Sequence, residues 1–250
     1  MLTLFFVDDL PTQKGSKYEF NNEDALHAIR VLRASVEDIY ALSDGKGAWS
    51  KVRVVSVAKK AMQVEVLETG FEEPLDTQFS VVQAIPKGDR AKESVELLTE
   101  GGADRIVMWA SARSIGKGSD KLQVTAREAS KQSRRYRIPT VSGAATTENI
   151  VDEIAKADLA IVFHESATQK ISDVAIPGSK KVLIIIGPEG GLTEAEVDLF
   201  AAAGAKVAHL GRPVLRSAHA GLAALSAVST ALKVWKIYGA ESRLHFLQNN

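Results

Sequence analysis

The chain has 250 residues, of which 45% are hydrophobic and 25% charged, and its 31 basic and 31 acidic side chains give a formal net charge of zero. This length suits one large domain or two modest ones, and no run approaches the roughly 18 apolar residues of a membrane-spanning helix. The absence of cysteine excludes disulfides and thiolate metal sites, and the five histidines lack metal-ligand spacing. We therefore expect no metal, no membrane partner and, since Asp8 and Asp9 follow an uncharged start, no signal peptide.

The first 70 residues are predicted to be mostly β. Residues 38–44 and 48–58 alternate between apolar and polar side chains on either side of a Gly-Lys-Gly turn, which predicts a hairpin. Residues 61–69 predict a further strand. Residues 21–33 predict a short helix with an Asn/Asp start and helically spaced apolar positions.

A different pattern follows a polar linker predicted at 70–77, because short apolar runs there alternate with helical periodicities. The predicted strands are 79–85, 105–110, 159–165, 181–187 and 206–211. The predicted helices are 89–102, 121–135, 146–157, 193–204 and about 217–235. Continuous apolar strands separated by helices indicate an α/β fold, with a mainly parallel sheet covered on both faces.

Basic residues are concentrated between Arg113 and Arg137. This segment contains eight basic residues and only two acidic residues, Asp120 and Glu128, which leaves a local excess of six positive charges. Such an excess fits a polyanionic partner even in a neutral protein. A solvated basic helix face fits the same residues equally well.

Three predicted strand ends have unusual sequences, at 163–166, 186–191 and 209–217. Ligands in open α/β sheets bind beyond the carboxyl ends of strands. The glycines of "GPEGG" allow another group to approach the backbone closely, and Thr193 with Glu196 predicts a capping box. The loop has no lysine and its glutamate would repel phosphates, so a neutral or zwitterionic ligand fits; a plain turn before a capped helix fits equally.

The third strand end leads into an Ala-rich helix. A serine is a favoured N-cap, so Ser217 is predicted to cap this helix. Arg216 beside the helix start concentrates positive charge in a crevice, or simply pairs with a nearby carboxylate.

The motifs "IGPEGGLTEAEV" (186–197) and "LGRPVLRSAHAGLAAL" (210–225) closely resemble those of the ribosomal RNA small subunit methyltransferase E family, a SPOUT-class family. Further matches follow the family's order at 27–33, 83–106, 112–114 and 127–139. The resemblance implies a PUA-like β-barrel at 1–72 and a SPOUT domain with a parallel sheet and a trefoil knot at 76–250. It also implies a cytoplasmic homodimer that uses S-adenosylmethionine to methylate N3 of a uridine in 16S ribosomal RNA of the small subunit.

The resemblance also assigns site residues. Those implied to bind the cofactor are His164, Glu165, Gly187, Pro188, Glu189, Gly190, Leu210, Gly211, Val214, Leu215, Arg216 and Ser217. Arg216 is implied to stabilise negative charge on the base, and Glu189 and His219 are candidate proton acceptors, although Glu189 could instead hold the loop. Those implied to bind RNA are Arg30, Arg33, Lys87, Arg90, Arg113, Arg127, Arg134, Arg135 and Arg137.

The sequence departs from the family pattern at the start of the last helix. Ser217-Ala218-His219-Ala220 stands where Thr-Glu-Thr-Ala is expected, and Gly-Arg-Pro replaces Gly-Pro-Arg just before it. Two alternatives therefore stay open. One is a SPOUT enzyme acting on a ribose 2′-hydroxyl or another base, and the other is an inactive RNA-binding or assembly factor.

Overall fold

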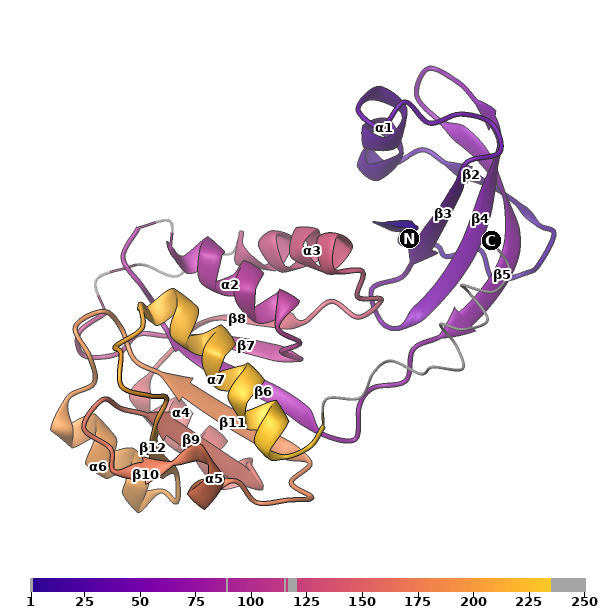
Figure 1. The fold of residues 1–250 in the computed structure, drawn as a ribbon. Helices are drawn as coiled ribbons and strands as arrows, with labels where there is room; N and C mark the ends of the chain where they lie inside the picture. The colour runs from indigo at the N-terminus through magenta and orange to yellow at the C-terminus, as the bar shows by residue number, and fades with distance from the viewer. Residues whose placement is uncertain (1, 89, 115, 117–120, 235–250) are drawn as a thin grey trace. The chain divides into compact units, whose positions relative to one another are not determined.

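The computed structural model describes residues 2–88, 90–114, 116 and 121–234. The chain divides into two compact units (Figure 1). The first unit contains residues 1–75 and 123–140, and the second contains residues 76–122 and 141–250. The division into domains at 1–72 and 76–250 stays a prediction, to which the structure adds that 123–140 packs within the first unit.

The first unit is built on a curled, mixed sheet of five strands in the order β1-β3-β4-β5-β2 (Figure 1). Its elements are β1 (Thr3–Phe6), β2 (Lys17–Phe20), α1 (Glu23–Arg30), β3 (Ile39–Ser43), β4 (Ala48–Val57), β5 (Met62–Phe71) and most of α3 (Leu122–Ser133). The predicted hairpin is confirmed as β3 and β4, which pair antiparallel, whereas β1 runs parallel to β3. A closed PUA-like barrel stays a prediction.

The core of the first unit comes from alternate residues of its strands. Val52 and Val54 of β4 and Val64 and Val66 of β5 are buried, while their sequence neighbours are more exposed. This alternation places one face of the sheet against the aromatic ring of Phe20 and its neighbours. The period of two that predicted these strands therefore also determines which face is buried.

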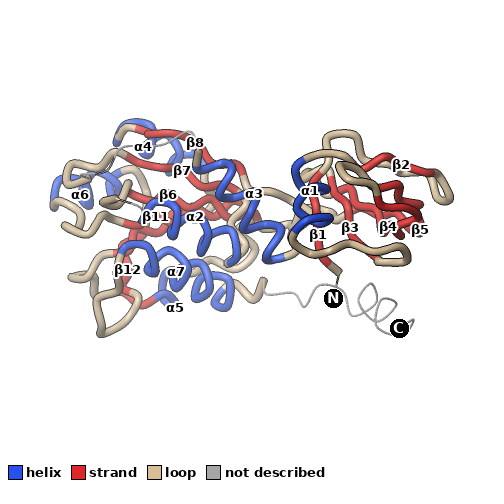
Figure 2. The backbone as a smooth tube through the Cα atoms, turned by 90° about the horizontal axis from the view of Figure 1, so that it is seen from above, coloured by secondary structure: helices blue, strands red, loops and turns tan. Residues whose placement is uncertain are grey.

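The second unit is an α/β structure with a seven-stranded sheet in the order β10-β12-β9-β11-β6-β7-β8 (Figure 1), whose strands are drawn in red in Figure 2. Its strands are β6 (Gln78–Ala84), β7 (Arg105–Trp109), β8 (Thr140–Ala145), β9 (Leu159–Phe163), β10 (Gln169–Lys170), β11 (Lys181–Ile186) and β12 (Lys206–His209). Strands β6, β7, β9, β10, β11 and β12 run parallel, as predicted from their continuous apolar sequences for all but β10. Strand β8 and the two-residue strand β10 were not predicted.

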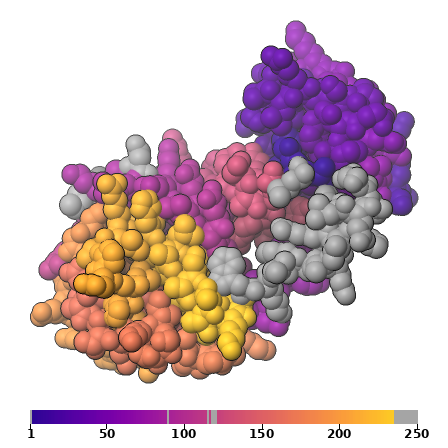
Figure 3. All heavy atoms as spheres, viewed as in Figure 1, coloured from indigo at the N-terminus to yellow at the C-terminus, as the bar shows by residue number. Residues whose placement is uncertain are grey.

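Helices cover both faces of this sheet (Figure 1). They are α2 (Arg90–Glu100), α4 (Thr147–Lys156), α5 (Ile171–Val174), α6 (Glu194–Ala202) and α7 (Ser217–Ala231). Helices α2, α5 and α7 pack together on one face, and α4 packs with α6 on the other. Figure 3 shows α7, in yellow, at the surface of the second unit.

The structure corrects the predicted end of the last helix and leaves other predictions untested. The last helix ends at Ala231, with Leu232 as its C-cap, so the predicted extension toward Trp235 is wrong, although Trp235 itself lies outside the described residues. Most of the segment 116–121 also lies outside them. The trefoil knot stays a prediction. No helix in the described part of the chain is long and apolar enough to cross a membrane.

Candidate functional site

A cavity of about 370 Å³ lies at the carboxyl ends of β9, β11 and β12. Its size falls within the range of small-molecule sites, and its place is where parallel α/β sheets bind ligands. It is lined by Phe163, His164, Glu165, Ile186, Gly187, Pro188, Glu189, Gly191, Leu192, His209, Leu210, Gly211, Arg212, Pro213, Val214, Leu215, Arg216, Ser217 and Ala220. The three strand ends that the sequence singled out therefore meet in one cavity.

The loop 187–191, called here the glycine loop, forms one wall. Gly191 has a φ of +70° that favours glycine, and a Cβ on Gly187 would lie 3.0 Å from the Leu192 side chain. The loop leads into α6 through a capping box, as predicted: the Thr193 hydroxyl accepts from the Glu196 amide and the Glu196 carboxylate accepts from the Thr193 amide.

Side chains from other segments hold the outer side of the glycine loop. Glu196 is buried and also accepts a 2.8 Å hydrogen bond from the Ala112 amide. Arg113 donates from Nη1 to the Gly190 carbonyl oxygen at 2.8 Å. These bonds fasten the glycine loop and the start of α6 to the turn after β7.

Glu189 forms an ion pair with Arg90, with 3.2 Å between Oε1 and Nη1. The pair is partly exposed, since 47% of the Arg90 side chain and 33% of the Glu189 side chain are accessible. The Glu189 carboxylate is engaged by a guanidinium of α2, the helix that begins at Arg90. The pairing therefore supports the interpretation in which Glu189 holds the loop.

The segment 210–216, called here the strap, forms the opposite wall. Val214 and Leu215 leave 77% and 41% of their surface exposed, although both are apolar. Apolar side chains exposed beside a cavity are typical of a site that covers a flat or apolar ligand. Arg216 adds a cation to this wall at the start of α7.

Ser217 does not cap α7, so that prediction is wrong. Arg216 occupies the N-cap position with an extended backbone, and its side chain makes no capping hydrogen bond to the helix. The Ser217 hydroxyl instead donates to the Gly187 carbonyl oxygen at 2.6 Å, and it accepts from Gln83 Nε2 at 2.8 Å. Ser217 thus bonds to groups distant in the sequence and not to its own helix, and its bond to Gly187 connects α7 to the glycine loop.

The two histidines of the predicted site differ in position. His164 lines the cavity, and its Nδ1 lies 2.8 Å from the Ser166 hydroxyl. His219 is half-exposed, does not line the cavity and pairs with Glu93 of α2, with 3.2 Å between Nε2 and Oε1.

All residues predicted to bind the cofactor line the cavity except Gly190. The cavity also includes residues that were not predicted, namely Phe163, Ile186, Gly191, Leu192, His209, Arg212, Pro213 and Ala220. Most of them lie within the two family motifs at 186–197 and 210–225. No three His, Asp or Glu side chains of the described residues are grouped so as to hold a metal.

A model of the RNA methyltransferase domain matches residues 72–229 of this chain. Ribosomal RNA small subunit methyltransferase E of Mycobacterium bovis is 33% identical to it over 244 residues, which cover 93% of each protein. The chain belongs to the ribosomal RNA small subunit methyltransferase E family.

Solved structures share the fold of this family member. A ribosomal RNA small subunit methyltransferase E from Neisseria gonorrhoeae, bound to S-adenosylmethionine, has a TM-score of 0.83 at 23% identity and covers 96% of this chain and 100% of its own. A putative methyltransferase from Legionella pneumophila, in complex with the same cofactor, has a TM-score of 0.82 at 24% identity and covers 92% of this chain and 98% of its own.

The basic residues predicted to bind RNA differ in their exposure and in the partners that they contact. In the first unit Arg30 and Arg33 are exposed, Arg134 Nε donates to the Leu2 carbonyl oxygen and Arg137 Nε to that of Glu72. Arg135 is partly buried and Arg127 pairs with Asp24. In the second unit Lys87 is exposed, whereas Arg90 and Arg113 contact the glycine loop. Their role toward RNA stays a prediction.

Proposed function

We propose that this protein transfers the methyl group of S-adenosylmethionine to N3 of a uridine in 16S ribosomal RNA, within the small ribosomal subunit. The observation that carries the proposal is the cavity between the glycine loop and the strap, which the family-specific motifs line from both sides. The solved relatives named above bind S-adenosylmethionine.

The walls of the cavity suit the parts of this cofactor. Backbone groups of the glycine loop offer hydrogen bonds to a neutral heterocycle, and the exposed Val214 and Leu215 offer an apolar surface for its face. The carboxylates of Glu165 and Glu189 and the guanidinium of Arg216 can complement a molecule that carries charges of both signs.

The methyl donor is a sulfonium, so it needs little activation, and the acceptor nitrogen must lose a proton as it attacks. Positioning of the two reactants and stabilisation of the charge that spreads onto O2 and O4 are the expected contributions of the protein. Arg216 is the residue proposed for the second task. Glu189 and His219 remain proposed proton acceptors, each of which would first have to leave a charged partner, Arg90 or Glu93.

The test is methyl transfer from labelled S-adenosylmethionine to purified small subunits and to naked 16S RNA, followed by mass spectrometry of the nucleosides. Labelled 3-methyluridine is expected. A 2′-O-methylated nucleoside or another methylated base would contradict the proposal and support a different specificity within the SPOUT class. Failure to bind the cofactor in calorimetry would instead support an RNA-binding factor without catalysis.

The family resemblance also leads us to propose a homodimer. Sedimentation equilibrium at micromolar concentration is expected to give twice the chain mass of 26.9 kDa. A monomer that is active at the same concentration would refute this part of the proposal.

A further inference from the structure

Gln83 is a fully buried amide in an apolar strand. It is 0% exposed, as are its neighbours Val82 and Ala84 of β6. In the parallel pairing with β11 it lies opposite Ile186, the residue that precedes the glycine loop. Burial of an amide is costly unless its polar atoms are bonded, so the hydrogen bonds of this side chain need a physical reason.

The direction of these hydrogen bonds is determined by their partners. The Gly187 carbonyl oxygen can only accept, so the Ser217 hydroxyl donates its hydrogen there and must accept from the amide of Gln83. The amide nitrogen of Gln83 also donates to the Ala84 carbonyl oxygen at 3.1 Å. Gln83 Nε2, Ser217 Oγ and the Gly187 oxygen thus form one directed chain.

This orientation leaves Gln83 Oε1 buried without a hydrogen-bond partner. The oxygen faces α7 at Gly221, where a Cβ would lie 3.3 Å away. An unsatisfied buried acceptor costs stability. The unsatisfied oxygen is therefore a cost of the orientation in which Gln83 Nε2 donates to Ser217.

The directed chain joins β6 to two segments that line the cavity, the glycine loop and the start of α7. Gly187 and Ser217 line its two walls, and Arg216 precedes Ser217 at the end of the strap. We propose that Gln83 is a positioning residue for cofactor binding: through Ser217 it sets the separation between the glycine loop and the start of α7. This inference rests on the proposed function, because the occupant of the cavity is taken to be S-adenosylmethionine.

Gln83→Met tests the inference, since methionine has a similar length and shape but no donor. The KM and the calorimetric Kd for S-adenosylmethionine are expected to rise about five- to twentyfold, as for loss of one buried hydrogen bond. The kcat at saturating cofactor and the KM for small subunits are expected to stay within about threefold of wild type, because neither the base nor Arg216 has lost a contact.

A double-mutant cycle with Ser217→Ala separates positioning from general destabilisation. If Gln83 acts through Ser217, Gln83→Met has little further effect on the cofactor Kd once Ser217 is replaced by alanine. The matched control is Thr77→Val, which removes a buried 3.1 Å hydrogen bond from Thr77 Oγ1 to the Ser179 carbonyl oxygen at the opposite, amino end of β6. This control is expected to lower the unfolding temperature and leave the cofactor Kd unchanged.

An unchanged cofactor Kd in folded Gln83→Met, or additive effects in the cycle, would overturn the inference while the proposed function stood. If the wild-type protein neither binds the cofactor nor transfers methyl groups, the proposed function fails first. Should Gln83→Met not fold, Gln83→Leu takes its place, since leucine also lacks a hydrogen-bond donor and Gln83 does not line the cavity. A raised Kd in folded Gln83→Leu supports the inference, and a wild-type Kd refutes it.

Discussion

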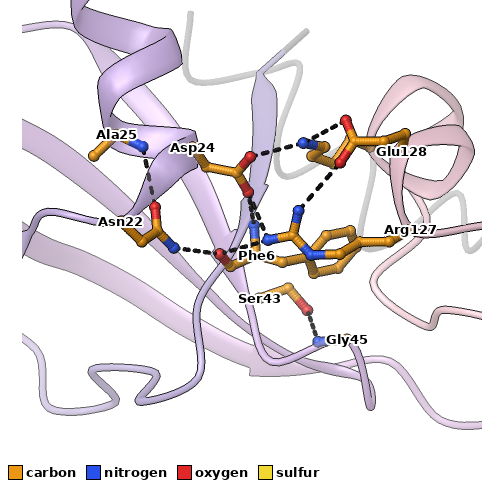
Figure 4. A network of polar contacts seen from close by, with 9 residues as sticks. Phe6, Asn22, Asp24, Ala25, Ser43, Gly45, Arg127 and Glu128 are labelled. Atoms are coloured by element: carbon orange, nitrogen blue, oxygen red, sulfur yellow. Dashed lines mark hydrogen bonds and ion pairs between the residues drawn. The ribbon is translucent and has the colours of Figure 1, made fainter. Parts of the chain in front are cut away.

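Replacement of Asp24 by asparagine tests the network that holds α3 within the first unit (Figure 4). Asp24 of α1 is 5% exposed and accepts three hydrogen bonds. They come from the Phe6 amide at 3.1 Å, Arg127 Nη2 at 2.8 Å and Lys131 Nζ at 2.7 Å. Because both cations belong to α3, one buried carboxylate anchors that helix across more than 100 residues of sequence.

The cost of Asp24→Asn follows from the exposure of these groups. Loss of one partner from a buried ion pair costs about 3–5 kcal/mol. Here the side chains of Arg127 and Lys131 are 34% and 18% exposed, and both keep a second, exposed partner in Glu128. Solvent and Glu128 therefore reduce the loss, and we expect the free energy of unfolding of the first unit to fall by about 2–3 kcal/mol at pH 7.

The loss depends on pH with a definite sign. Burial alone would raise the pKa of Asp24, but hydrogen bonds from Lys131, Arg127 and the Phe6 amide outweigh burial and lower that pKa. A carboxyl group whose pKa is lower in the folded state stabilises the fold above its unfolded pKa of about 3.9. That stabilisation is lost as the pH falls through the folded-state pKa. The difference in stability between the wild-type protein and the Asp24→Asn variant is therefore expected to shrink below about pH 4.

Urea unfolding followed by the fluorescence of Trp49 measures this difference. The protein has three tryptophans, so a background of Trp109→Phe and Trp235→Phe leaves Trp49 of the first unit as the reporter. Glu128→Gln is the matched control, since Glu128 is 54% exposed in the same network and should cost less than about 1 kcal/mol. A loss below about 1 kcal/mol for Asp24→Asn at pH 7, or a loss of equal size at about pH 3, would refute the reasoning.

Three further changes test other parts of the structure. Arg216→Ala is expected to lower kcat about 10²–10³-fold, because a charge-stabilising donor is lost; a normal single-turnover rate would contradict the assignment. Arg134→Ala should weaken RNA binding and make the slope of the logarithm of the binding constant against the logarithm of salt concentration shallower by about one. The control Lys156→Ala should leave this slope unchanged. Gly70→Ala would place a methyl group against the ring of Trp49. We expect it to lower the free energy of unfolding in urea by about 1–3 kcal/mol, and unchanged stability would contradict this.

Local patterns in the sequence predicted most elements of both units. Apolar alternation predicted the hairpin of β3 and β4, and continuous apolar runs predicted the parallel strands β9 and β11. The capping box of Thr193 and Glu196 was likewise predicted, since both partners lie within one helical turn. Strand β10 was missed because two residues carry no period, and its pairing with β12 alone defines it.

The family motifs also identified most of the cavity from sequence, because the glycine loop and the strap are each continuous segments. The partners of single side chains were decided by tertiary structure. Ser217 was expected to cap its own helix, yet it bonds to Gly187, 30 residues earlier, and to Gln83, 134 residues earlier.

The partners of charged side chains could not be predicted from the sequence either. The basic residues of α3 were evident in the sequence, but their pairing with Asp24 depends on a carboxylate more than 100 residues away. Periodicity and caps report interactions within a few residues, whereas a buried polar group bonds to whichever partner the packed elements bring within about 3 Å. The sequence by itself therefore determined the elements and the loops of the site, and only the tertiary structure decided which polar groups hold them together.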